Sequence, residues 1–89
     1  MTVDINVKIN NETGLHARPA SQLVNTAGKF ESKIEIVLDN KEVNAKSIMG
    51  IMSLGIGKGD EIILRADGDD AEAAVSALVE FIEVELLEH

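Results

Sequence analysis

The stretch Gly14-Leu15-His16-Ala17-Arg18-Pro19-Ala20-Ser21 marks the point near the start of the chain where a strand pattern gives way to a helix pattern. Before it, apolar and polar residues alternate from Val3 to Ile9, which is typical of a half-buried strand. After it, apolar residues recur at helical spacing, at Ala20, Leu23, Val24 and Ala27. We therefore predict a strand over residues 3–9, a turn-rich loop over 10–14, and a helix over 17–27.

Alternation returns in the middle of the chain. Residues 34–38 form a second predicted strand, and a hairpin turn at Asp39-Asn40-Lys41 leads to a short strand around Val43. Ser47 suits the N-cap of a short helix that runs through Leu54. The segment therefore predicts a strand, a strand and a short helix in that order.

The last third predicts one more strand and one more helix. The strand buries Ile62, Leu64 and Ala66, and the helix covers about residues 71–87. Asp69 and Glu72 have the spacing of a capping box, which predicts that Asp69 caps this helix. The apolar stripe of the helix comprises Ala74, Val75, Leu78, Ile82 and Leu86.

The resulting order, β-α-β-β-α-β-α, predicts an α+β fold. We expect a two-layer open-faced sandwich in which three helices cover one face of a four-stranded antiparallel sheet. The length of 89 residues suits one domain, expected over residues 1–88. The end, Leu87-Glu88-His89, resembles the remnant of an expression tag, so His89 is excluded from the chemistry.

Composition narrows the classes of function. Aromatic residues make up 2% of the chain and its net charge is −8, so both base stacking and phosphate-backbone attraction are weak and no direct nucleic-acid partner is expected. The chain has no cysteine. It shows neither a signal-peptide pattern nor an apolar run long enough to insert in a membrane, so we expect a cytoplasmic protein. Neither residues 55–59 nor residues 67–70 match a nucleotide or calcium loop, so no cofactor and no metal are expected.

His16 stands where a helix begins, and that position favours anions. The first turn of a helix leaves backbone N–H groups unpaired and carries the positive end of the helix dipole. Arg18 adds a permanent cation whose planar fork suits phosphate oxygens. A simple cap or a solvated side chain is the commoner role for a lone histidine, but Gly14 permits a close backbone approach here. We expect His16 to carry a phosphoryl group that the Ala17 N–H and Arg18 stabilise.

Two motifs connect this chemistry to a known family. They are Gly14-Leu15-His16-Ala17-Arg18-Pro19-Ala20 and Val43-Asn44-Ala45-Lys46-Ser47-Ile48-Met49-Gly50. The chain, over essentially its whole length, resembles HPr, the histidine-containing phosphocarrier of the bacterial phosphoenolpyruvate-dependent sugar phosphotransferase system. The resemblance implies that His16 takes a phosphoryl group from enzyme I and passes it to enzyme IIA domains of sugar permeases. Such a carrier is a stoichiometric member of a relay rather than an enzyme.

Ser47 has two interpretations. As an N-cap it is purely structural. The resemblance implies that it is also phosphorylated by the ATP-dependent HPr kinase/phosphorylase of low-GC Gram-positive bacteria. The added phosphate would block enzyme I and favour a transcriptional regulator of carbon catabolite control.

Apolar residues near both sites are expected to form an exposed docking patch for protein partners. The five apolar residues of a two-turn helix cannot all face inward, and exposed methionine adapts to several partners. We expect Ile51 and Leu54 to be buried, and the protein to be a monomer with small, transient interfaces. The expected patch comprises Leu15, Ala20, Leu23, Ile48, Met49 and Met52.

Three alternatives remain at this point. One is a regulatory binding module that uses Ser47 and leaves His16 vestigial, although paralogues of that kind typically lack the histidine. Another is a phosphocarrier of a nitrogen-related or dihydroxyacetone-related relay, against which the intact Ser47 segment argues. The third is a small hydrolase with His16 as nucleophile. Neither motif contains the second acid or base that hydrolysis would need, which argues against it.

Overall fold

A computed structural model describes residues 1–88 of the protein, so His89, the residue excluded from the chemistry above, lies outside the described residues. The elements follow the predicted order. The strands are β1 (Thr2–Lys8), β2 (Lys33–Leu38), β3 (Lys41–Asn44) and β4 (Glu61–Asp67). The helices are α1 (Ala17–Ala27), α2 (Ile48–Ser53) and α3 (Ala71–Glu83), and a 3-10 turn, η1 (Glu85–Glu88), follows α3.

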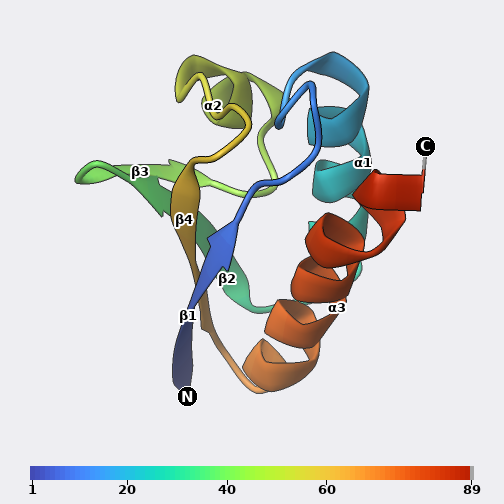
Figure 1. Cartoon of the computed structure of the whole chain (residues 1–89). Helices are drawn as coiled ribbons and strands as arrows, with labels where there is room; N and C mark the ends of the chain where they lie inside the picture. Colours follow the sequence, from blue (N-terminus) through green and yellow to red (C-terminus); the bar gives the residue numbers. More distant parts are fainter. Residues whose placement is uncertain (89) are drawn as a thin grey trace.

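The four strands form one antiparallel sheet in the order β1-β4-β2-β3 (Figure 1). Leu64 on β4 pairs with Ile5 of β1 on one side and with Ile36 of β2 on the other, and Ile36 pairs in turn with Val43 of β3. Directly paired residues in an antiparallel sheet point to the same face. One row of apolar side chains therefore crosses all four strands on the face that meets the helices.

The helices complete the second layer. α3 packs on β1 and β4, α1 packs beside α3, and α2 contacts both α1 and β3. Figure 1 shows α1 and α3 on the same side of the sheet, with α2 near the end where α1 begins. The opposite face of the sheet has no helix over it among residues 1–88. The structure therefore confirms the predicted open-faced, two-layer α+β sandwich.

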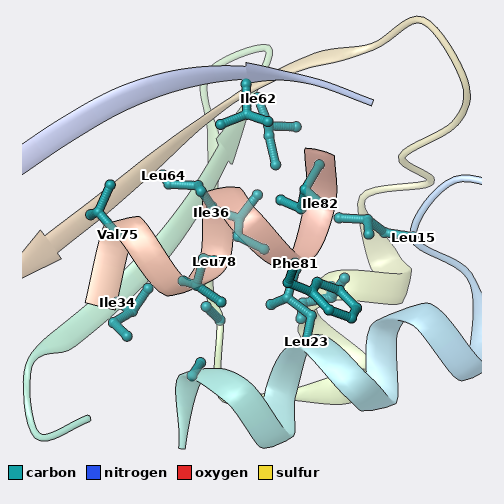
Figure 2. Close-up of a cluster of buried hydrophobic side chains, with 14 of the residues drawn as sticks. Leu15, Leu23, Ile34, Ile36, Ile62, Leu64, Val75, Leu78, Phe81 and Ile82 are labelled. Carbon is teal, nitrogen blue, oxygen red and sulfur yellow. The ribbon is translucent and has the colours of Figure 1, made fainter. Parts of the chain in front are cut away.

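The core is aliphatic apart from Phe81 and lies between the layers (Figure 2). All three predicted core residues of β4 are fully buried, and the predicted stripe of the last helix is buried too, its last member Leu86 lying in η1. Burying a Leu, Ile or Val side chain stabilises the fold by about 1.5–3 kcal/mol, so these residues dominate its stability. Ile5 departs from the prediction with 39% of its surface exposed, because β1 is an edge strand with no neighbour on its outer side.

The last helix begins at Ala71 as predicted, but its cap and its end differ from the prediction. The expected capping box is wrong, because α3 begins after Asp70, and the carboxylate of Asp70 makes no cap hydrogen bond. It instead accepts hydrogen bonds from the backbone N–H groups of Glu31 and Ser32 and from the Ser32 hydroxyl, which ties the α1–β2 loop to the start of α3. These donors lower the pKa of Asp70, the Ser32 hydroxyl most of all. At the other end the helix stops at Glu83 and tightens into η1.

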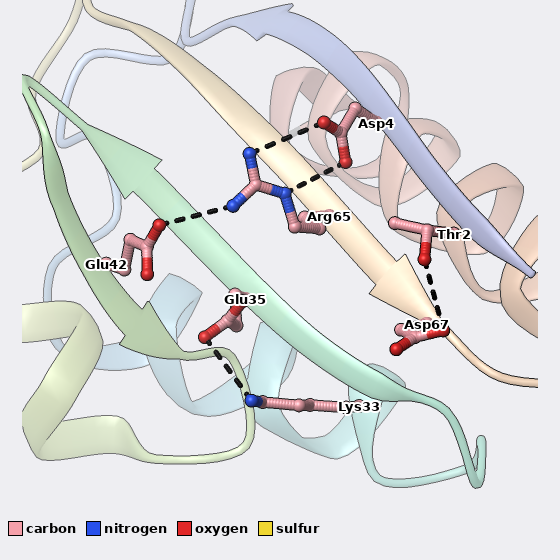
Figure 3. Close-up of polar contacts among 7 residues, drawn as sticks. All are labelled: Thr2, Asp4, Lys33, Glu35, Glu42, Arg65 and Asp67. Carbon is pink, nitrogen blue, oxygen red and sulfur yellow. Dashed lines mark hydrogen bonds and ion pairs between the residues drawn. The ribbon is translucent and has the colours of Figure 1, made fainter.

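A row of charged side chains crosses the open face of the sheet (Figure 3). Arg65 on β4 donates from Nε to Oδ1 of Asp4 on β1 at 3.0 Å. It also donates from Nη1 to Oε2 of Glu42 on β3 at 3.2 Å, so that its side chain reaches across β2. The Asp4 carboxylate is the main cause of a raised pKa at Arg65. These contacts are solvent-exposed, so each adds at most about 1 kcal/mol to stability, and they link three strands without covering the face.

Candidate functional site

The loop before α1 is held in place by a close contact with the loop before β4. Gly14 has a φ of +63°, and a Cβ atom at its position would lie 2.3 Å from the carbonyl oxygen of Ile56. The N–H of Leu15 donates to that same carbonyl oxygen at 3.1 Å, and the Leu15 side chain is only 1% exposed. Only glycine permits both this backbone conformation and this approach. His16 therefore follows directly after an anchored residue.

His16 is the N-cap residue of α1, as the sequence predicts. Its backbone is extended, with φ −110° and ψ 148°, and its side chain makes no cap hydrogen bond. The residue is exposed. The imidazole is therefore accessible at a helix N-terminus, where free N–H groups and the helix dipole favour a bound anion.

Ala17, the first residue of α1, has a backbone conformation that nothing in the sequence indicates. Its φ is +45°, in the left-handed region that alanine rarely adopts. The only other non-glycine residues with positive φ within residues 1–88 are Asp39 and Asn40, which form the β2–β3 hairpin turn. Such a conformation costs an alanine roughly 1–2 kcal/mol. Strained residues of this kind cluster at functional sites, and this one adjoins His16.

An open groove of about 650 Å³ lies beside His16. One wall comes from α1, a second from residues 10–13, and a third from η1. The lining residues are Asn10, Asn11, Glu12, Thr13, His16, Ala17, Arg18, Pro19, Gln22, Leu86 and Leu87. The loop wall and the η1 wall were not predicted as parts of the site. The structure thus brings together His16, Ala17 and Arg18 on one side of a groove large enough for a group held on the imidazole.

The two charged side chains of the groove differ in their partners. Arg18 is exposed and makes no ion pair or side-chain hydrogen bond with any side chain that the structure describes. Its guanidinium can therefore donate to an anion in the groove. Glu12 is paired with Lys58, with 2.6 Å between Oε1 and Nζ, and this lowers the pKa of Glu12. The carboxylate in the groove is thus already engaged by a cation.

The second predicted site, Ser47, is the N-cap of α2. Its Oγ accepts a hydrogen bond from the N–H of Gly50 at 3.0 Å, which confirms the structural interpretation. Behind it, α2 buries Ile51 and leaves Ile48, Met49 and Met52 exposed, with Met49 80% accessible. We call these three exposed residues the α2 patch. Helices α1 and α2 contact each other, and Figure 1 shows α2 near the end where α1 begins. Since His16 is the N-cap of α1, it and the α2 patch belong to neighbouring elements at that end.

The rest of the predicted docking patch is wrong. Leu15, Ala20 and Leu23 are at most 1% exposed and belong to the core. Figure 2 shows Leu23 beside Phe81 of α3. Ala20 and Leu23 are covered because α1 packs against α3. Leu15 precedes α1 and is buried where its loop is anchored to Ile56. Only the members of the patch on α2 are exposed.

Within the part of the chain that the structure describes, no group of three or more His, Cys, Asp or Glu side chains could hold a metal ion. None of the described helices is long and apolar enough to cross a membrane.

Comparison with known proteins agrees with this geometry. The family model described as "PTS HPr component phosphorylation site" matches residues 3–84. The HPr-like protein Crh of Halalkalibacterium halodurans is 51% identical over 83 residues, which is 93% of this chain and 99% of the relative.

Two solved structures give the same result. HPr-C-His from Thermoanaerobacter tengcongensis is 54% identical with a TM-score of 0.93, over 98% of both chains. The phosphocarrier protein HPr from Bacillus anthracis is 46% identical with a TM-score of 0.89, over 92% of this chain and 98% of that one. The chain therefore belongs to the HPr family, the phosphocarrier proteins of the phosphotransferase system.

Proposed function

We propose that His16 is the residue that carries the phosphoryl group. In this reaction a ring nitrogen of His16 attacks the phosphorus held on enzyme I, and an N–P bond forms as the bond to enzyme I breaks. The same exchange then runs from His16 to an enzyme IIA domain of a sugar permease. The observation that carries the proposal is the accessible imidazole at the start of α1, in a groove that also holds Arg18.

The neighbours of His16 suit a phosphoryl group that must be held and then released. The N–H of Ala17 and the guanidinium of Arg18 supply donors to its oxygens, and the helix dipole favours its negative charge. Hydrolysis of the adduct would need a base to activate water. The one carboxylate among the described lining residues, Glu12, is paired with Lys58, which supports a carrier over a hydrolase.

Ser47 is proposed as a regulatory site for an HPr kinase/phosphorylase. A phosphate there would add about −1.5 to −2 charges at the N-terminus of α2, next to the exposed apolar side chains of Ile48 and Met49. An apolar partner surface would lose affinity for a face that carries this charge. The modified face would exclude enzyme I and favour a catabolite-control transcriptional regulator.

The α2 patch is the proposed contact surface for enzyme I and the enzyme IIA domains. We also propose that the carrier acts as a monomer in the cytoplasm. An HPr from Thermoanaerobacter tengcongensis was solved as a dimer, so sedimentation at micromolar concentration is the direct test of the monomer. A single species with the mass of one chain is expected, and a dimer would contradict it.

A purely regulatory role is the second candidate, because the relative that is 51% identical is an HPr-like Crh. In that role Ser47 would be modified and His16 would not. The pairing of His16 with Arg18 in one groove favours the carrier, since a regulatory module has no use for an accessible imidazole beside an anion-binding cation.

One experiment separates the two candidates. The protein is incubated with phosphoenolpyruvate and enzyme I, and the carrier is expected to gain a phosphate that is labile in acid and stable in alkali. His16→Ala should abolish it, and Ser47→Ala should retain it. A parallel reaction with HPr kinase and ATP should give an acid-stable phosphate that Ser47→Ala abolishes. A serine adduct without a histidine adduct would establish the regulatory role.

A further inference from the structure

We propose that Asn11 is a positioning residue that holds His16 in place for phosphoryl transfer, an inference that rests on the proposed function of His16. Asn11 lies in the loop between β1 and α1. Within the described chain it is one of two buried polar residues, with 9% of its surface exposed, and the other is Ser32. Neither motif of the family resemblance includes it.

Asn11 holds the peptide unit between Gly14 and Leu15. Its side-chain Nδ2 donates to the carbonyl oxygen of Gly14 at 2.9 Å, and its backbone carbonyl oxygen accepts from the Gly14 N–H at 3.2 Å. At the other end of that peptide unit, the Leu15 N–H donates to the carbonyl of Ile56 at 3.1 Å. Both polar ends of one peptide plane are therefore held, so the plane cannot rotate without breaking a hydrogen bond.

We call the hydrogen bonds from Asn11 to Gly14 and from Leu15 to Ile56 the clamp. The clamp fixes the backbone directly before the residue that reacts. The clamped plane ends at the Cα atom of Leu15, whose side chain is buried, and His16 is the next residue. Ala17 follows with its φ of +45°, a conformation that persists only where the surroundings hold it. The clamp holds the backbone before His16 and α1 holds it after. Releasing the clamp would let the imidazole leave the geometry that in-line transfer needs.

Fold stability alone does not account for an asparagine at this position. The Oδ1 atom of Asn11 is shielded from solvent and has no hydrogen-bond donor among the described residues. A buried amide with one unpaired end destabilises a protein, whereas an apolar side chain could fill the same space without that cost. The hydrogen bonds from Nδ2 to Gly14 and, at 3.4 Å, to Thr13 are what the asparagine supplies.

The test measures the turnover number and KM of enzyme I with this protein as the varied substrate. Asn11→Ala removes the amide, and Asn11→Asp keeps its shape but presents no donor to the Gly14 carbonyl at neutral pH. Each variant is expected to lower the turnover number about tenfold, because small misplacements of a reacting group have effects of this order. KM is expected to stay unchanged, since Asn11 is not part of the α2 patch. If the charged variant fails to fold, Asn11→Ala alone carries the test.

Ser32→Ala is the matched control. It also removes a buried polar group, but the hydrogen bond that it breaks joins the Ser32 hydroxyl to Asp70, beyond the other end of α1. It should lower stability and leave both kinetic constants unchanged. A wild-type turnover number in folded Asn11→Ala, or an equal loss in Ser32→Ala, would overturn the positioning role while leaving the proposed function intact. A wild-type chain that takes up no phosphoryl group would overturn both.

Discussion

The close contact between Gly14 and the loop before β4 predicts how much stability an alanine at Gly14 would cost. The prediction can be worked out by comparison with Gly55, which has the same φ angle. Gly14 and Gly55 both have a φ of +63°. A Cβ atom at Gly55 would meet nothing within 4 Å, whereas one at Gly14 would lie 2.3 Å from the Ile56 carbonyl oxygen and 2.7 Å from the Cα of Gly57. The pair Gly14→Ala and Gly55→Ala therefore separates backbone strain from steric contact.

The expected magnitudes follow from these two terms. Gly55→Ala carries only the strain of an alanine in the left-handed region, about 1 kcal/mol. Gly14→Ala adds the displacement of a packed backbone, roughly 1–3 kcal/mol more, so its total is about 2–4 kcal/mol. For a domain of this size each kcal/mol lowers Tm by roughly 4–8 °C. Gly55→Ala should lose about 4–8 °C and Gly14→Ala about 10–30 °C.

Thermal and urea unfolding followed by circular dichroism measure both losses. Since Gly14 carries the Leu15 anchor, Gly14→Ala should also slow phosphorylation of His16, while Gly55→Ala should not. Equal losses of stability in the two variants would refute the close approach of the loops, and with it the explanation of how His16 is presented.

Three further predictions concern the ends of the helices and the division between core and surface. In the folded state the pKa of Asp70 lies below its ordinary value of 3.8, so the stabilising contribution of its carboxylate is present above that value and is lost as the pH falls through and below it. Urea midpoints should therefore fall more steeply below about pH 4 in the wild type than in Asp70→Asn, and parallel curves would contradict this. Ser47→Ala should cost about 1 kcal/mol in urea unfolding through the lost cap, and no change would argue against the hydrogen bond to the N–H of Gly50. Leu23→Ala should lower the free energy of unfolding by about 2–5 kcal/mol, whereas Met49→Ala should change it by at most about 0.5 kcal/mol and weaken binding to enzyme I, measured by calorimetry. The opposite result would indicate that Leu23 contacts partners, as the sequence predicts, and that Met49 belongs to the core.

The fold could be predicted from the sequence because two simple periodicities dominate it. Alternation predicts β1, β2 and β4, the hairpin turn before Val43 predicts β3, and helical spacing predicts α1 and α3 to within a few residues. The order of the strands in the sheet was not predicted, since periodicity says which face of a strand is buried but not which strand is its neighbour. Ile5 shows the same limit, because its exposure depends on β1 lying at an edge.

Errors arose where a residue has both a local and a tertiary use. Asp69 and Glu72 have the right spacing for a capping box, but the N-cap residue of α3 is Asp70. The carboxylate of Asp70 accepts hydrogen bonds from Glu31 and Ser32, which are far away in the sequence. Leu23 lies on an apolar stripe that could face either a partner or the core. The position of α3 decides between them, and spacing within α1 cannot reveal it.

The candidate site shows the clearest division between what spacing can and cannot reveal. His16 and Arg18 are identifiable from the sequence because a histidine at a helix start, two residues before an arginine, is a chemical pattern in itself. The left-handed backbone of Ala17 and the clamp made by Asn11 leave no such pattern, because alanine and asparagine are common residues whose geometry depends on contacts with neighbouring loops. These features could be seen only in the structure.

The central claim is that His16 takes up a phosphoryl group and gives it to another protein. The most direct measurement isolates the protein after phosphorylation by enzyme I, removes enzyme I, adds an enzyme IIA domain, and follows the phosphate by phosphorus NMR. The account predicts that the signal of a phosphohistidine disappears from this protein as a new one appears on the IIA domain. A phosphate that never reaches His16, or that leaves it only as inorganic phosphate, would contradict the account.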